Sequence, residues 1–348
     1  MKFLMAATVC ALAALSGNAA AQELPATALK VLGGMSTRAA YKEVELPFWS
    51  KTIPENSHGQ VTAEIKGFDE MGIKGPELFR MMKQGVIEFG SVPLSYFYNE
   101  IPANEAIDLA GLVPDAKVAR AMVDAFTPEL ARIYAANYQA KLLGVTPYGP
   151  QVLFCNGRIS GLSDLRGKKV RTVTRSQADV MEALGAISVN IASNEVVPAF
   201  RNKTIHCAVS ATMVGYSAKW YEAATHLYAL PVGWNQEVHA VNQKAWDQLD
   251  PRVQTFLQTN IAQLIDSLWL FSAKQNLLGI ACNTGTKACP FAARGKMTLV
   301  LPTQADLATF KRVATQKMLP KWAARCSVPC VTEFNKTVGK VAGVVAKK

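Results

Sequence analysis

The chain has 348 residues, of which 50% are hydrophobic and 18% are charged, and its formal net charge is +11. This length leaves room for about two domains, and the composition excludes a disordered or low-complexity protein. Apart from Lys168-Lys169 and Lys347-Lys348, the basic residues are dispersed, whereas nucleic-acid binders cluster them on one face or element. We therefore expect a generally basic surface and no nucleic-acid partner.

The N-terminus is typical of an export signal. Lys2 precedes an apolar run over residues 3–15, and the small residues 19–21 end in Ala21. Such a run is too short to span a bilayer, which takes about 20 apolar residues. We expect residues 1–21 to be a signal peptide that is cleaved near Ala21, so that a soluble mature chain reaches the periplasm.

In chain order, the first half predicts strands that alternate with helices. Val61, Ala63 and Ile65 alternate with polar residues, as in a half-buried strand, and Pro76 and Glu77 favour a helix start. The predicted elements are a strand at 28–32, a helix from 36 through 49, a strand at 61–66, a helix at 75–85, a strand at 86–92, a helix from Thr127-Pro128-Glu129 to about 141 and a strand at 142–145.

The second half repeats this alternation. Asp250 as N-cap and Pro251 at the first turn predict a long helix that runs to about residue 278. The other predicted elements are a strand at 169–173, a helix at 176–184, a strand at 189–192, a short helix from Ser193 to 200, a strand at 205–209 and a helix from Thr303 to about Cys326. Alternating strands and helices predict an α/β fold with largely parallel strand pairing.

The six cysteines of the mature chain predict disulfide bonds, because their number is even and the expected compartment is oxidising. The sequence favours the pairs 282–289 and 326–330, or crossed pairings among these four, with Cys155–Cys207 as a third bridge. A zinc site is disfavoured because no C-x2-C spacing occurs.

Common catalytic motifs are missing from the sequence, which contains no G-x-S-x-G, H-E-x-x-H, Walker loop or G-x-G-x-x-G after a strand. His206 and Cys207 are adjacent on a predicted strand, so their side chains point to opposite faces and cannot form a nucleophile–base pair. We predict no catalytic residues, no metal and no cofactor. Gly33-Gly34 before a helix either binds an anion through backbone N–H groups or only turns the chain.

Several segments resemble, in order, those of TRAP-transporter periplasmic solute receptors of the DctP type. The similarity covers nearly the whole mature chain. The segments that carry it are Pro47-Phe48-Trp49, Gly75-Pro76-Glu77-Leu78, Asp164-Leu165-Arg166-Gly167-Lys168-Lys169-Val170-Arg171, Glu182 to Ala186, Asn194 to Ala199, Ile205 to Ser210, Lys219 to Glu222, Pro231 to Trp234 and Val241 to Trp246.

The resemblance implies a two-lobed periplasmic-binding-protein fold with hinge strands, a central ligand cleft and a long helix that braces both lobes. Lobe I would comprise residues 28–148 with 237–275, and lobe II residues 149–236 with 276–345. It also implies the capture of a small organic acid for delivery to membrane permease subunits. An exported enzyme on the same two-lobed fold is the alternative.

Three residues depart from the family pattern. Gln151 stands where acid-binding members have an arginine, His206 replaces the usual aspartate, and Lys203 replaces a glycine. Without the second arginine, a ligand with one carboxylate is favoured over a dicarboxylate.

The resemblance places Arg171 at the cleft, where its planar guanidinium would hold a carboxylate through two bonds. The alternative is an ion pair with a neighbouring side chain. The full predicted ligand set comprises Arg171, Gln151 as a neutral donor, the hydroxyls of Ser210 and Thr212, and Trp234 and Tyr96 as apolar walls.

Overall fold

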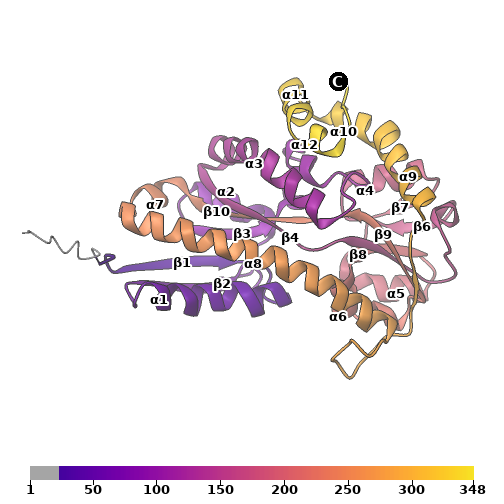
Figure 1. The fold of residues 1–348 in the computed structure, drawn as a ribbon, viewed down its shortest axis with the longest axis horizontal. Helices are drawn as coiled ribbons and strands as arrows, with labels where there is room; N and C mark the ends of the chain where they lie inside the picture. The colour runs from indigo at the N-terminus through magenta and orange to yellow at the C-terminus, as the bar shows by residue number, and fades with distance from the viewer. Residues whose placement is uncertain (1–22) are drawn as a thin grey trace, which may run out of the picture.

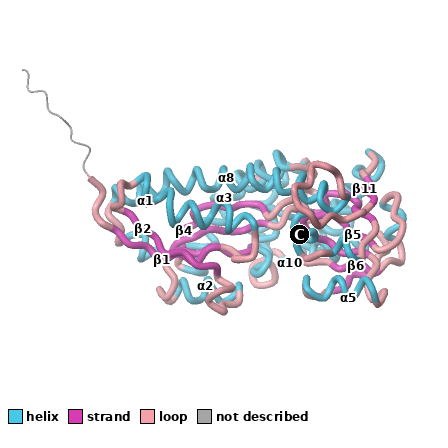
Figure 2. Tube along the Cα trace, turned by 90° about the horizontal axis from the view of Figure 1, so that it is seen from below, coloured by secondary structure: helices cyan, strands magenta, loops and turns pink. Residues whose placement is uncertain are grey.

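The computed structural model describes residues 23–348, so the predicted signal peptide lies outside the described residues. Two β-sheets with flanking helices lie end to end along the molecule, and each is the centre of one lobe (Figures 1 and 2). The lobe I sheet has the order β2-β1-β3-β10-β4, and the lobe II sheet has the order β11-β9-β5-β8-β6-β7. The strands are β1 (Thr27–Gly33), β2 (Val61–Gly67), β3 (Phe89–Pro93), β4 (Ala140–Pro147), β5 (Gln151–Cys155), β6 (Lys169–Arg171), β7 (Ile187–Val189), β8 (Cys207–Ala211), β9 (His226–Gly233), β10 (Gln236–Asn242) and β11 (Thr298–Val300).

Lobe I follows the predicted order of elements closely. β1 pairs in parallel with β2 and β3, while β10 runs antiparallel to β3 and β4. The helix predicted to end at Trp49 continues through two π-helical turns into α1 (Ile53–Asn56). The helix α2 (Gly75–Lys83) has proline in its first turn, as predicted. The strand expected at 86–92 is β3, which begins only at Phe89.

The predicted start of the next helix was wrong. α3 spans Ala116–Tyr138, and Pro128 lies inside it rather than at its first turn. Asp115 caps the true N-terminus by accepting a hydrogen bond from the Val118 N–H at 2.8 Å. A proline inside a helix loses one backbone hydrogen bond, but this helix buries a long apolar face that includes Phe126, Leu130 and Tyr134. Burial of that face offsets the missing bond.

In lobe II, two strands are displaced by two residues from their predicted positions. The strand expected at 189–192 is β7, and the one expected at 205–209 is β8, so Ser210 lies within a strand instead of ending it. The helices of this lobe begin near their predicted positions. They are α4 (Arg175–Ala183) and α5 (Val196–Arg201), and a further helix that was not predicted, α6 (Thr212–Ser217), follows β8.

The long helix α8 (Pro251–Thr284) begins at the predicted Asp250 cap and runs along both lobes (Figure 2). Its 34 residues correspond to a length of about 50 Å. It packs on β4 in lobe I and on α6 in lobe II. At Gly279, an added Cβ would lie 2.5 Å from the backbone nitrogen of Met213, so glycine is what lets α8 approach α6 closely. Helix α7 (Gln243–Asp247) precedes α8.

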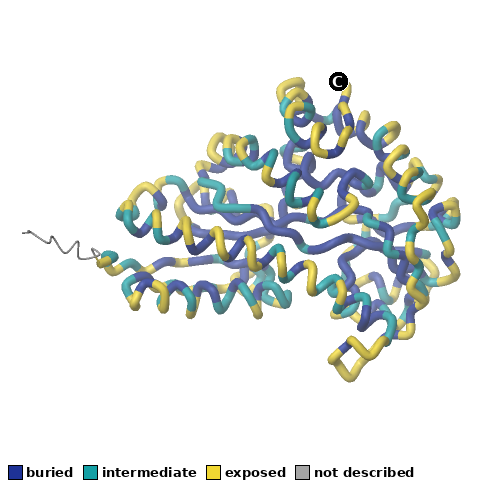
Figure 3. Tube along the Cα trace, viewed as in Figure 1, coloured by how far each residue is buried: buried dark blue, intermediate teal, exposed yellow. Residues whose placement is uncertain are grey.

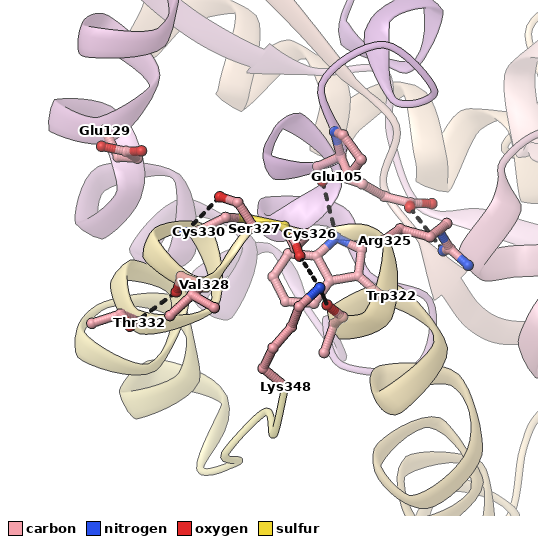
Figure 4. The surroundings of a disulfide bond; sticks show 12 residues. Glu105, Glu129, Trp322, Arg325, Cys326, Ser327, Val328, Cys330, Thr332 and Lys348 are labelled. Atoms are coloured by element: carbon pink, nitrogen blue, oxygen red, sulfur yellow. Dashed lines mark hydrogen bonds and ion pairs between the residues drawn. A yellow bond between two sulfur atoms is a disulfide. The ribbon is translucent and has the colours of Figure 1, made fainter.

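The C-terminal helices contact elements of both lobes. The turn Ala314–Met318 contacts α4, whereas α12 contacts α3. Arg325 pairs with Asp179 of α4 at 2.7 Å and with Glu105 of lobe I at 3.5 Å (Figure 4). The helices are α9 (Gln304–Val313), α10 (Leu319–Arg325), α11 (Val328–Lys336) and α12 (Val338–Ala342).

Within residues 23–348 the structure contains three disulfide bonds, and they follow the uncrossed pairing. Cys155–Cys207 joins the neighbouring strands β5 and β8, Cys282–Cys289 closes the end of α8, and Cys326–Cys330 connects α10 to α11 (Figure 4). Most sheet strands and the inner faces of the helices are buried, whereas the outer helix faces are exposed (Figure 3). No helix within residues 23–348 is long and apolar enough to cross a membrane.

Candidate functional site

Two chain segments cross between the lobes side by side, and they define where a ligand would lie. One segment connects β4 to β5 and contains Tyr148, and the other connects β9 to β10 and contains Asn235. The Tyr148 N–H donates a hydrogen bond to the Asn235 carbonyl at 2.7 Å. The carboxyl end of β3 pairs with the start of β10, and the carboxyl end of β8 pairs with the start of β5. The parallel strands of both lobes therefore end at this crossing, and ligands of open α/β sheets bind outside the carboxyl ends of such strands.

Arg171 is the last residue of β6 and is 8% exposed. Its Nε donates to the Ile191 carbonyl at 3.1 Å and its Nη1 to the Val209 carbonyl at 2.8 Å, while Trp220 lies under the guanidinium at 5.8 Å. It makes no ion pair with a carboxylate within residues 23–348, and burial lowers its pKa. The alternative role for Arg171, a salt bridge to a neighbouring side chain, is therefore not observed within residues 23–348.

The strand register sorts the predicted polar residues onto two faces of the lobe II sheet. Arg171 pairs with Ala208, and Val152 with Ser210, which places Arg171 and Ser210 on one face because side chains alternate along a strand. Ser210 is buried. Gln151 pairs with Ala211 and so lies on the opposite face, where its amide donates to the Gly149 carbonyl at 3.0 Å.

Two further predicted residues have structural contacts. The Thr212 hydroxyl donates to the Asn276 carbonyl of α8 at 3.0 Å, so it joins α6 to α8. Trp234 is 5% exposed within the main core, and its indole N–H donates to the Val113 carbonyl at 3.3 Å. Tyr96 differs from both. It is 40% exposed in the 3-10 helix Leu94–Phe97, and the proximity of Glu237 contributes to its raised pKa.

A buried polar cluster that was not predicted from the sequence lies at the lobe I side of the crossing. Glu237 pairs with Arg38 at 2.7 Å, and Arg38 stacks on the Tyr148 ring at 3.3 Å. Glu45 accepts hydrogen bonds from Ser91, and His239 lies 3.9 Å from it. The available signal was Glu237 and His239 in one strand with Val238, Ala240 and Val241, since charged residues are rarely fully buried without a partner.

The Gly33-Gly34 turn was expected either to bind an anion through its backbone N–H groups or only to turn the chain. The Gly34 N–H donates to the Glu45 carboxylate at 2.8 Å. The anion at this turn is thus a side chain of the protein. Cys207, the other candidate for chemistry, is bonded to Cys155 and cannot act as a free nucleophile.

These buried groups predict a pH dependence of stability. Burial raises the pKa of Asp108 from 3.8 to about 7 and that of Glu45 from 4.5 to about 7, and it lowers the pKa of His239 from 6.5 to about 3. A carboxyl group with a raised folded-state pKa binds more protons when folded, so its stabilisation is lost as pH rises through that window. His239 acts in the opposite sense below pH 6.5. The carboxyls with a raised pKa, which also include Glu105 and Glu237, outnumber the imidazole, so stability should fall as pH rises between about pH 5 and 6.5.

Urea unfolding at about pH 5, 6.5 and 7.5 measures this dependence. Asp108→Asn should flatten it, whereas Asp250→Asn should not, because the pKa of Asp250 is already lowered to about 2. Stability that rises from pH 5 to 7 would contradict the assignment.

A cavity of about 500 Å³ lies elsewhere, between the loop at 111–114, Pro231 and α9. None of the predicted ligand residues lines it. The candidate site is therefore the crossing of the two segments, with Arg171 and Ser210 in lobe II and the acidic cluster in lobe I.

Two α/β lobes joined by crossing segments, with buried charges at the carboxyl ends of their strands, define a two-lobed binding protein. The family of bacterial extracellular solute-binding proteins, family 7 (DctP), matches residues 34–318. The chain belongs to this family, and its role is that of a solute-binding protein. No curated protein matches the sequence.

Solved structures with low sequence identity share the fold. A TRAP periplasmic solute-binding protein from Ochrobactrum anthropi is 19% identical with a TM-score of 0.79, over 92% of this chain and 97% of that one. DctP6, an extracytoplasmic solute receptor from Bordetella pertussis that binds pyroglutamic acid, is 23% identical with a TM-score of 0.75, over 90% and 99%. TeaA, the ectoine-binding protein of the TeaABC TRAP transporter, is 18% identical with a TM-score of 0.77, over 90% and 99%.

Proposed function

We propose that this protein captures a small organic acid in the periplasm and delivers it to the membrane subunits of a TRAP-type transporter. Arg171 is the proposed carboxylate-binding residue, Ser210 a hydroxyl donor beside it, and Tyr96 part of the wall from lobe I. Gln151, Thr212 and Trp234 are not included, because their side chains are already engaged or lie on another face.

The observation that supports this function is the buried guanidinium of Arg171. Moving a cation out of water costs several kcal/mol unless a countercharge accompanies it. Arg171 has only two backbone carbonyls as hydrogen-bond partners within residues 23–348. A ligand carboxylate would supply the missing charge and accept the remaining N–H bonds.

The ligands of the structural relatives agree with an acidic solute. Besides the pyroglutamic acid of DctP6, a receptor from Rhodoferax ferrireducens holds malonate and one from Desulfovibrio salexigens holds orotic acid. The relatives also argue against the exported-enzyme alternative, because they are named as solute receptors. Delivery to a permease, and removal of residues 1–21 on export, complete the proposal.

Mass spectrometry of the exported protein tests this function. Under native conditions the protein should retain a small acid that is released on unfolding, and the unfolded chain should have the mass of a mature chain that begins near Gln22. Returning the released acid to the protein should re-form the complex without changing the mass of the acid. Conversion of the acid into a product would favour the enzyme alternative, and a neutral or cationic bound solute would contradict the proposal.

A further inference from the structure

The lobe I side of the crossing holds two buried carboxylates whose oxygens differ in their partners. Glu45 is fully engaged, since one oxygen accepts from the Gly34 N–H at 2.8 Å and the other from the Ser91 hydroxyl at 2.6 Å. Glu237 uses only Oε2, which pairs with Arg38 at 2.7 Å. Its Oε1 is buried and has no hydrogen-bond partner among residues 23–348.

The position of Oε1 places it at the edge where a ligand would lie. Glu237 is the second residue of β10, directly after the crossing segment, and pairs with Pro93 at the carboxyl end of β3. A Cβ added to Gly34, the residue that follows β1, would lie 2.6 Å from Oε1. The Tyr148 hydroxyl, on the other crossing segment, is also buried without a partner in the described chain.

The charges of this cluster favour a donor over an anion. Arg38 is the cation of this cluster, because the pKa of His239 is lowered to about 3 and its imidazole is neutral near pH 7. Arg38 is already held by Glu237 and by the Tyr148 ring. The Gly34 N–H, which could have bound an anion, is taken by Glu45. A ligand carboxylate placed here would lie against the carboxyl groups of Glu45 and Glu237, with Arg38 and the Gly34 N–H already engaged.

The ligand therefore has a preferred direction in the site, an inference that rests on the proposed function. We infer that the solute is a small carboxylate that also carries a hydrogen-bond donor, N–H or O–H, outside its carboxylate group. Arg171 of lobe II holds the carboxylate, and Oε1 of Glu237 in lobe I accepts the hydrogen bond. A buried acceptor discriminates strongly against a ligand without the donor, because that ligand leaves the acceptor unpaired.

Calorimetry with isosteric pairs of carboxylates tests this inference on the wild-type protein. The pairs are pyroglutamate with its ring-oxygen lactone analogue, proline with tetrahydrofuran-2-carboxylate, and lactate with propionate, so that lactam N–H, ammonium and hydroxyl donors are distinguished. Malonate is the dicarboxylate comparison. In the pair that binds, the donor-bearing member should bind at least about 5-fold more tightly, the lower end of the penalty for a buried polar group left unpaired.

Two variants assign the preference to one atom. Glu237→Gln can turn its amide N–H₂ toward the ligand, so the preference should fall to within about threefold of unity or reverse. Glu45→Gln removes the same charge from the cluster but leaves Oε1 of Glu237 in place, so the preference for the donor should remain. If Glu237 has only a structural role, its variant would lower the melting temperature and keep the preference.

The outcomes separate this inference from the proposed function. Equal binding of both members of each pair, tighter binding of malonate than of every donor-bearing acid, or an unchanged preference in Glu237→Gln would each overturn the inference while carboxylate binding stands. If no carboxylate of the panel binds, the proposed function itself fails, and the inference fails with it.

Discussion

Arg171→Ala is expected to weaken binding of the carboxylate ligand by roughly 30-fold to several-thousand-fold, which corresponds to about 2–5 kcal/mol. The variant removes the cation and leaves the ligand carboxylate desolvated at the end of β6. Arg171→Lys should recover only part of the loss, because an ammonium cannot form two parallel bonds to a carboxylate. Calorimetry with the acid released from the wild-type protein measures both ratios.

A matched control for Arg171 is Lys169→Ala. Lys169 lies two residues earlier on β6 and is exposed, so its removal changes the charge of the lobe without affecting a buried group. Arg171 also donates to two backbone carbonyls of lobe II, so the melting temperature of each variant must be measured without ligand. If Arg171→Ala is as stable as the wild type and binds as tightly, Arg171 is not the carboxylate-binding residue.

Removing the Cys155–Cys207 bond by a double alanine substitution is expected to cost about 4 kcal/mol of unfolding free energy. The cost follows from loop-closure entropy, because this bond closes a loop with a sequence separation of 52, and the constraint on the unfolded chain grows with loop length. The Cys326–Cys330 bond has a separation of only 4, so the same substitutions there should cost about 2 kcal/mol.

Urea unfolding of the two double variants at one pH gives this comparison directly. Cys155 and Cys207 are also fully buried, so the lost packing of their sulfur atoms adds to the larger of the two costs. An equal cost for both pairs, or a larger cost for Cys326–Cys330, would contradict the loop-length argument.

Local patterns in the sequence determined most of the element order. The alternation at 61–65 predicted β2, and Asp250-Pro251 predicted the start of α8, because each signal depends on neighbouring residues alone. The start of α3 was mispredicted because tertiary contacts outweigh a local signal there. Thr127-Pro128-Glu129 carries a strong local start signal, yet contacts with the lobe I core keep Pro128 inside a longer helix.

The sequence by itself predicted the export signal, the disulfide bonds from an even number of cysteines, and the α/β class. Its resemblance to a known family singled out Arg171. Only the tertiary structure decided which residues share a surface with Arg171. The register of β5, β6 and β8 placed Ser210 on its face and Gln151 on the other, and a shift of one residue would have reversed this. The pairing of Glu237 with Arg38, 199 positions apart, has no local signal, because it arises where β10 returns to lobe I after the chain has built most of lobe II.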